Sequence, residues 1–174
     1  MEKKARLTVM FIMLLAASCG LDDLTGMRHE GEENRRVIRG FQMTSTEGEN
    51  KAWKLSASRA EFLDGDEERQ ILAWDIEAEF YGEEESTLLS APYGELDRDS
   101  QAIDTSGEVR IVSGSRVIDT RDVRWDPEKA VFETDAPALI TTPGGQVRGT
   151  GMTASADLSD IRLREHISGE FGDR

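Results

Sequence analysis

The stretch RWDPEKAVFETDAPALI, residues 124–140, contains the pattern that decides the fold. Asp126 precedes Pro127, which suits a type I turn because proline fixes the backbone angle required at the second turn position. Apolar residues stand six and fourteen positions after the aspartate, at Phe132 and Ile140. The stretch therefore predicts a strand that ends in a tight acidic turn and a longer strand that returns.

The same arrangement occurs elsewhere in the chain. Residues 95–111, ELDRDSQAIDTSGEVRI, open their turn at Asp97, and residues 155–171, SADLSDIRLREHISGEF, align with them through Asp157. A looser copy begins at Asp64. Apolar residues follow Asp97 and Asp157 at the same two intervals, namely Ile103 and Ile111, then Leu163 and Phe171. The period is about 30 residues, and one hairpin of this size cannot bury its apolar face alone.

Alternating segments fill the chain between these units. KAWKLSAS places Trp53 and Leu55 on one side, and GEVRIVSG does the same with Val109 and Ile111. A period of two is typical of half-buried strands, and no window has a sustained helical stripe. Stacked hairpins would give two sheets that face inward. We therefore expect an all-β fold, an antiparallel β-jellyroll or short stacked-hairpin β-solenoid, with about nine to eleven strands and almost no helix.

The first 19 residues predict an export signal. MEKKAR is positively charged, LTVMFIMLLAA is apolar, and small residues precede Cys19, which is the only cysteine. This order is that of a secretory signal, and the apolar run is shorter than the roughly 20 residues that span a bilayer. AASC resembles a bacterial lipobox, although Ala16 stands where leucine is usual. Residues 1–19 are therefore predicted to be a lipoprotein signal peptide and lipobox with a lipidated Cys19; the alternative is ordinary secretion with a free thiol.

Composition divides the remainder of the chain. Residues 20–35 are polar and aperiodic, and they are predicted to form a flexible tether because they cannot bury enough apolar area to offset the entropy of ordering. Residues 36–174 are then one folded domain. The chain has 35 acidic and 21 basic residues, a net charge of −14. Such a surface repels phosphate backbones, so nucleic acid is not an expected partner.

Patterns for catalysis and metal binding are weak. The two histidines, His29 and His166, belong to no HExxH motif, and the GxSxG and paired-cysteine motifs are missing from the sequence. Acidic stretches at 64–68 and 97–104 lack the twelve-residue spacing of a calcium loop. We therefore expect no enzyme activity, no cofactor and no metal site. A polysaccharide-active enzyme is the alternative, although nothing singles out one pair among the 35 acids.

The order of five motifs resembles the LptC family of lipopolysaccharide export proteins, and more broadly the LptA/LptC/OstA-type repeat. The family patterns W-x-L-x-A-x-x-A, G-x-L-D, G-x-V-x-I, T-D-x-P-V-x-I and G-x-G-M correspond here to Trp53–Ala60, Gly94–Asp97, Gly107–Ile111, Thr134–Ile140 and Gly149–Met152. Two features depart from the family. A lipid replaces the usual N-terminal membrane helix, and Ala138 stands where valine is common.

The resemblance implies a periplasmic carrier without catalytic residues. Such a protein accepts lipopolysaccharide from an inner-membrane ABC transporter complex and passes it to an LptA-like jellyroll. An apolar trough would shield the acyl chains, whose exposure to water costs about 25 cal/mol per Å². The lipid anchor would hold the chain to a membrane, the inner one by family resemblance, with the outer one as the alternative.

The candidate lining of this trough is a set of large apolar residues. They are Trp53, Leu55, Phe62, Leu72, Trp74, Phe80, Val109, Ile111, Trp125, Phe132, Ile140 and Met152. The alternative is that they pack the closed core of a scaffold lipoprotein.

The two end strands are the candidates for docking, because edge strands present unpaired backbone groups. On the family resemblance, the first strand, about 37–46, faces the transporter complex. The last strand, 161–171, receives the next jellyroll. Its docking residues are Ile161, Leu163, Ile167 and Phe171. The alternative is that charges such as Arg162 and Arg164 blunt this edge.

Overall fold

The computed structural model describes residues 34–47, 50–64, 69–82 and 85–171. Nine strands lie in this part of the chain: β1 (Asn34–Glu47), β2 (Asn50–Asp64), β3 (Arg69–Phe80), β4 (Thr87–Asp97), β5 (Ile103–Ser113), β6 (Arg116–Asp126), β7 (Val131–Thr142), β8 (Gly145–Ser155) and β9 (Ile161–Phe171). The described residues contain no helix that is long and apolar enough to cross a bilayer. The all-β prediction and its strand number are confirmed.

The predicted signal peptide and Cys19 lie outside the described residues. Most of the predicted tether, residues 20–35, does so as well. Its last two residues are strand, because β1 begins at Asn34.

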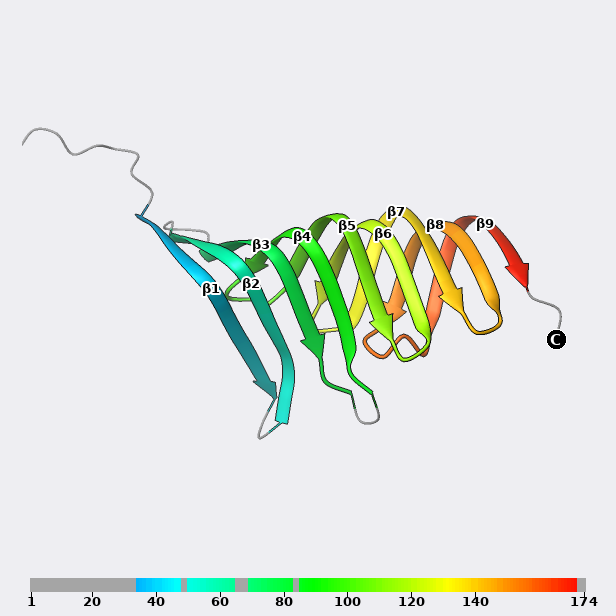
Figure 1. The fold of residues 1–174 in the computed structure, drawn as a ribbon, viewed down its shortest axis with the longest axis horizontal. Coiled ribbons are helices and arrows are strands. Elements are labelled where there is room, and N and C mark those ends of the chain that lie inside the picture. The colour runs from blue at the N-terminus through cyan, green and yellow to red at the C-terminus, as the bar shows by residue number, and fades with distance from the viewer. Residues whose placement is uncertain (1–33, 48–49, 65–68, 83–84, 172–174) are drawn as a thin grey trace, which may run out of the picture. The chain divides into compact units, whose positions relative to one another are not determined.

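The nine strands form one antiparallel sheet in sequence order. Each strand pairs through its backbone only with its neighbours in the sequence, so the hairpins stack in a row from β1 to β9 (Figure 1). The predicted stacked-hairpin architecture is confirmed. In place of the two expected sheets, however, one continuous sheet curls round so that its two halves face each other.

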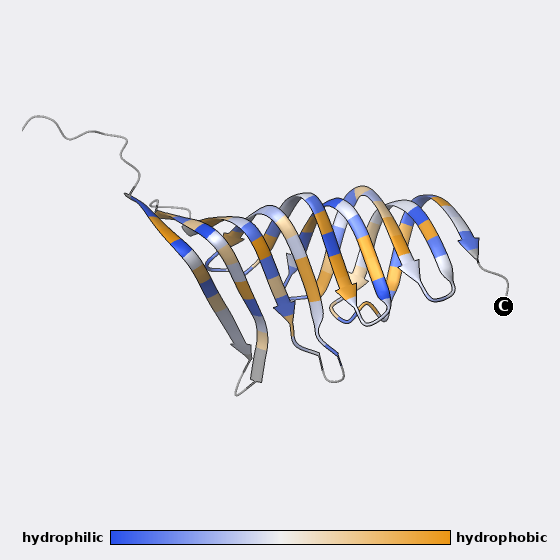
Figure 2. Ribbon diagram, viewed as in Figure 1, coloured by the Kyte–Doolittle hydropathy of each residue, from blue (hydrophilic) through white to orange (hydrophobic). Residues whose placement is uncertain are grey.

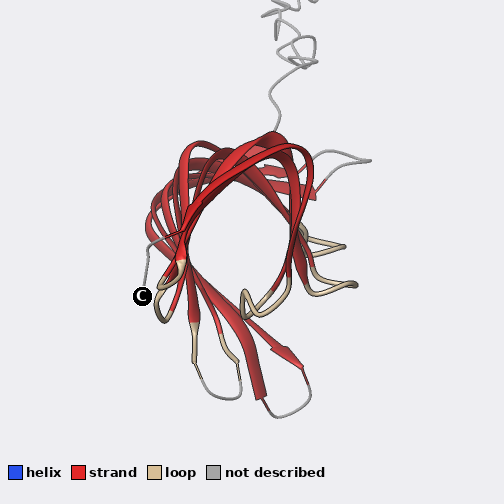
Figure 3. Ribbon diagram, turned by 90° about the vertical axis from the view of Figure 1, so that its right-hand side faces the viewer, coloured by secondary structure: helices blue, strands red, loops and turns tan. Residues whose placement is uncertain are grey.

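A bend in the middle of the strands explains how one sheet makes two walls. The residue at the bend has a positive φ on several strands: 64° at Gly40, 50° at Asp75, 104° at Gly107 and 72° at Gly151. Positions opposite these residues are skipped in the ladders or shifted in register. Bulges of this kind bend and twist a strand, and glycine adopts positive φ without strain. Each strand therefore arches over the interior and contributes to both walls (Figure 3).

Acidic turns close the hairpins along one side. Asp97 accepts hydrogen bonds from the backbone N–H groups two and three residues later, at 2.9 and 2.7 Å, and Asp126 accepts the equivalent pair at 3.0 and 3.1 Å. The pKa of Asp97 is lowered chiefly by its bond from Ser100, and the pKa of Asp126 by the Lys129 ammonium. These carboxylates fold the turns, as the sequence predicts.

In the third copy of the repeat, the structure places the start of the turn two residues earlier than the sequence predicts. Equivalent cross-strand pairs are Leu96–Ile103, Trp125–Phe132 and Ala154–Ile161. Ser155, and not Asp157, therefore corresponds to Asp97 and Asp126. The Ser155 hydroxyl oxygen accepts a hydrogen bond from the backbone N–H of Asp160 at 3.0 Å, so serine fills the turn role in this copy.

Candidate lipid-binding interior and docking edges

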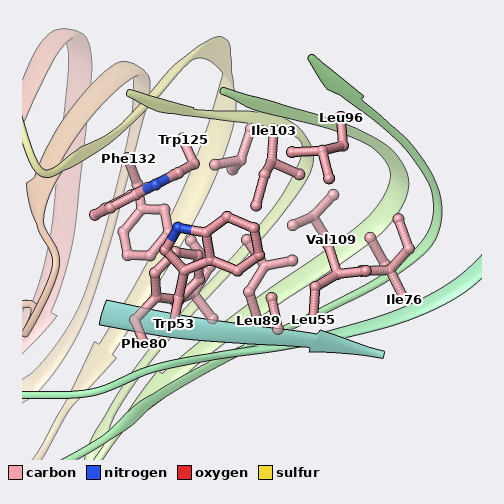
Figure 4. Close-up of a cluster of buried hydrophobic side chains, with 14 of the residues drawn as sticks. Trp53, Leu55, Ile76, Phe80, Leu89, Leu96, Ile103, Val109, Trp125 and Phe132 are labelled. Carbon is pink, nitrogen blue, oxygen red and sulfur yellow. The ribbon is translucent and has the colours of Figure 1, made fainter. Parts of the chain in front are cut away.

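Three aromatic rings join the two walls of the sheet. The Phe132 ring centroid lies 4.9 Å from those of both Trp125 and Phe80, and Phe80 lies 4.5 Å from Trp125. Phe80 is the last residue of β3, whereas the other two flank the β6–β7 turn on the opposite wall. Trp53 lies beside them (Figure 4) and is 2% exposed. The interior is closed at this aromatic cluster of Trp53, Phe80, Trp125 and Phe132.

Aliphatic side chains continue this packing along the interior (Figure 4). Apolar residues alternate with polar ones along the strands, as Figure 2 shows, and the apolar ones face inward. Most predicted lipid-binding residues belong to one buried cluster: Trp53, Leu55, Phe80, Val109, Ile111, Trp125, Phe132, Ile140 and Met152, with Phe62 packed against it. Through the middle of the sheet these side chains contact one another and form a core.

Trp74 and Leu72 are the predicted residues that the structure does not bring into this cluster. Ile76 faces inward, and strict alternation would place Trp74 on the same side. The bend at Asp75, where φ is 50°, shifts the phase by one residue, so that Ala73 is the buried neighbour instead. A one-residue slip moves every following side chain to the other face. Leu72 is placed outside for the same reason.

Trp74 contributes to a cluster on the outer face. Its ring packs edge-on against Tyr93 at 5.6 Å, and the Arg59 guanidinium lies 4.7 Å from its centroid. Arg59 and Arg35 both pair with Glu61, whose side chain is 2% exposed although it points away from the core. These contacts cover the outer face of β2 to β4 and leave Trp74 with a structural role.

A cavity of about 530 Å³ opens between the two rows of turns; we call it the side cavity. One side is lined by the β3–β4 connection and the β5–β6 turn, including Glu85 and Arg116. The other side is lined by the β6–β7 and β8–β9 turns, including Ala156 and Asp157. Because Phe80 also lines it, the side cavity borders the aromatic cluster.

A second cavity of about 410 Å³ lies at the β9 end of the sheet; we call it the end cavity. Its lining is mostly hydrocarbon: Ile140, Val147, Leu158, Ile161, Leu163 and Ile167, with Arg116, Thr142 and Ser159. It brings together three predicted docking residues, Ile161, Leu163 and Ile167, with one predicted lipid-binding residue, Ile140. The side chain of the fourth docking residue, Phe171, lies outside the described part.

Leu158 is a lining residue that sequence reasoning missed. It stands in the β8–β9 turn at φ 56°, among serines and aspartates, yet it is fully buried. A leucine inside an otherwise polar turn is the signal that could have found it, because turns seldom place large apolar side chains without a packing reason.

β1 and β9 are the two ends of the sheet. On β1, Val37 and Ile38 are 53% and 44% exposed; on β9, Ile167 is 61% exposed. The arginines of β9 are engaged beside it: Arg164 donates to the carbonyl oxygen of Thr134 at 2.8 Å, and Arg162 pairs with Asp160. Both arginines therefore have partners, and the exposed Ile167 lies on the same strand.

The acidic turns face their own backbones. The Asp157 carboxylate accepts hydrogen bonds from the Ser155 hydroxyl at 2.6 Å and from the Ser159 N–H at 3.0 Å, and these bonds lower its pKa to about 2. Within the described strands and turns, no three histidine, cysteine, aspartate or glutamate side chains lie together as a metal site would require.

A family model described as "Lipopolysaccharide-assembly, LptC-related" matches residues 9–171 of the chain. The matched range contains all nine strands, both cavities and both ends of the sheet. No curated protein matches the sequence.

Proposed function

Because the chain belongs to the LptC-related family of lipopolysaccharide-assembly proteins, we propose that it is a periplasmic lipopolysaccharide carrier. Membership itself implies involvement in lipopolysaccharide transport in the cell envelope. The more specific proposal is that the protein holds acyl chains inside its curled sheet and passes them to an adjacent jellyroll. It acts by transient binding, without catalysis of its own.

The end cavity is the observation that supports this proposal. It combines six aliphatic side chains with a position at the end of the sheet, beside the strand proposed to meet the next protein. Burying each methylene of an acyl chain contributes about 0.8 kcal/mol, so a segment of about ten methylenes would gain about 8 kcal/mol before the entropy of binding is subtracted. A cavity of this character at a docking edge suits transfer between two proteins.

The aromatic cluster restricts the route that an acyl chain can take. Phe80, Trp125 and Phe132 occupy the space between the walls, so a chain that crosses this level must separate them. We therefore place the initial binding in the end cavity and the side cavity. The same packing favours the second candidate function, a scaffold lipoprotein whose core stays closed.

The ends of the sheet supply the proposed partners. A lipid on Cys19 would hold the protein to the membrane, and β1 would face the inner-membrane ABC transporter complex. β9 would receive an LptA-like jellyroll by strand addition, since its apolar residues flank an unpaired backbone. An anchor in the inner membrane suits this order of partners, because it holds β1 near the transporter complex. An anchor in the outer membrane would instead hold β1 near the opposite membrane.

Site-specific photocrosslinking in cells tests the carrier function. A photoreactive benzoylphenylalanine replaces Leu158 or Ile167 in the end cavity, and Trp74 on the outer face is the matched control. We expect adducts with lipopolysaccharide from the first two positions and none from the third. If correctly folded protein gives no adduct at Leu158 and Ile167, the scaffold function replaces the carrier function.

A further inference from the structure

Arg116 lines both the side cavity and the end cavity. It is the first residue of β6 and follows the β5–β6 turn, so it stands on the wall opposite Leu158 and Ser159 of the β8–β9 turn. Other residues line only one of these two cavities. Its guanidinium is therefore placed where an apolar chain in the end cavity would meet the polar gap between the turns.

Among the described residues, four other arginines on this half of the sheet have an aspartate partner, whereas Arg116, Arg121 and Arg148 have none; of these three, Arg116 alone lines the two cavities. Arg110, Arg124, Arg162 and Arg164 each pair with an aspartate. The hydrogen bonds and ion pairs found among the described residues include none with Arg116. In a chain with 35 acidic residues, an arginine at a cavity without a carboxylate partner keeps its charge available for a ligand.

Two acids, Asp157 and Glu85, share the lining of the side cavity with Arg116. Asp157 accepts three hydrogen bonds within its own turn, from the Ser155 hydroxyl and from the N–H and hydroxyl of Ser159. The Glu85 carboxylate lies over Gly114, in the space that a side chain would need there. Both acids line the side cavity but not the end cavity. A negative head group at the end cavity would therefore meet the arginine first.

We propose that Arg116 binds the phosphate of a phosphorylated acyl lipid whose hydrocarbon chain occupies the end cavity. The guanidinium fork matches the oxygens of a phosphate in a bidentate, charge-assisted contact. The aliphatic lining receives the chain, and the gap between the turns leaves the rest of the head group in water. This inference rests on the proposed carrier function, and it assigns that function a head-group contact.

Binding of two lipids that differ only in the phosphate tests the inference. Full-length protein in detergent-free, polymer-stabilised solution is titrated with lysophosphatidic acid and, separately, with monoacylglycerol of the same chain length. Displacement of the neutral fluorophore N-phenyl-1-naphthylamine reports both. The variants are Arg116→Gln, Arg116→Lys and the matched control Arg121→Gln, which removes an exposed charge from the same strand outside both cavities.

We expect Arg116→Gln to bind lysophosphatidic acid about tenfold more weakly, because the charge-assisted contact between the guanidinium and the phosphate is lost. Its affinity for monoacylglycerol should stay that of the unmodified protein. Arg116→Lys should fall between the two, and Arg121→Gln should change neither affinity. Added salt should weaken lysophosphatidic acid binding by the unmodified protein and by Arg116→Lys, but not by Arg116→Gln.

Three other outcomes would each overturn a different part of the proposal. If the unmodified protein binds both lipids and Arg116→Gln leaves the phosphate preference intact, the head-group contact is wrong and the carrier function stands. If the unmodified protein binds neither lipid, the carrier function itself is wrong. Displacement of the fluorophore by inorganic phosphate alone would overturn the assignment of an acyl lipid.

Discussion

Replacing Phe132 with alanine tests whether the walls of the curled sheet are held together by aromatic packing. Phe132 is fully buried, and its ring contacts Phe80 and Trp125 at centroid distances of 4.9 Å each. Because Phe80 belongs to β3 on the opposite wall, its contact with Phe132 joins two strands that no backbone ladder connects. The variant removes the ring at the centre of this junction.

The expected loss is large compared with the stability of a domain. Truncating a buried phenylalanine to alanine costs about 3–5 kcal/mol, because a cavity remains in addition to the lost transfer free energy. Each aromatic pair contributes about 0.5–1.5 kcal/mol beyond its buried area. The two lost pairs are part of this measured cost and place the variant in the upper half of its range, so we expect a decrease of about 4–5 kcal/mol, out of the roughly 5–15 kcal/mol typical of a folded domain.

Equilibrium unfolding in urea, followed by tryptophan fluorescence, measures this decrease. Leu88→Ala is the control, since Leu88 is 54% exposed and its removal should change the free energy of unfolding by less than about 0.5 kcal/mol. A double-mutant cycle with Phe80→Ala should give a coupling free energy of about 1 kcal/mol. A loss below about 1.5 kcal/mol without coupling would refute the packing argument. It would mean that the interior is an open trough at this level.

Three further changes test the turns, the bend and the edge. Asp157→Ala should remove stability that is present above about pH 4 and is lost as the pH falls toward 2, because the folded pKa of Asp157 is lowered to about 2. Urea unfolding midpoints at about pH 4 and about pH 2 measure this difference. Equal pH dependence of the midpoint in the variant and the unmodified protein would contradict it. Gly151→Ala should lower the free energy of unfolding by about 1–2 kcal/mol, since φ is 72° and the new Cβ would lie 2.6 Å from Arg164 Nε. Gly144→Ala is the control, because its new Cβ would meet only one atom, 3.7 Å away. Thermal melts should show a lower melting temperature for the first variant and almost no change for the second. Ile167→Asp should weaken capture of a purified LptA-like jellyroll at least tenfold with an unchanged melting temperature, and undiminished capture would remove β9 as the docking edge.

Several features of the protein were predictable from local sequence. Alternation of apolar residues indicates strands, and an Asp126–Pro127 pair indicates a turn, because both depend on backbone geometry within a few residues. The period of the repeat then indicates stacked hairpins, since a lone hairpin cannot bury its own face. These local rules led to the fold class, and most of the lining residues that they predicted lie in the buried cluster.

The face of each residue depended on the tertiary structure wherever a strand bends. Trp74 lies on the outer face because the positive φ at Asp75 shifts the inward–outward alternation of the side chains by one residue. An aspartate within a strand does not by itself predict a positive φ. The predicted turn of the third repeat differs from the observed one because Ser155, and not an aspartate, accepts the turn's backbone hydrogen bond. Asp97 and Asp126 have this role in the other two copies. Different residues can satisfy the same backbone hydrogen bonds, so their spacing alone does not align the copies.

The sequence by itself determined that this chain is a stack of antiparallel hairpins with one apolar side. Only the tertiary structure decided that this side is packed across the middle and hollow near β9. The reason is that the cavities lie between turns far apart in the chain: Arg116 meets Leu158 and Ile167 only after the sheet has curled. The periodicity of the sequence predicts the face of the strand on which a side chain lies. The space between the two walls depends instead on the combined bending of all the strands.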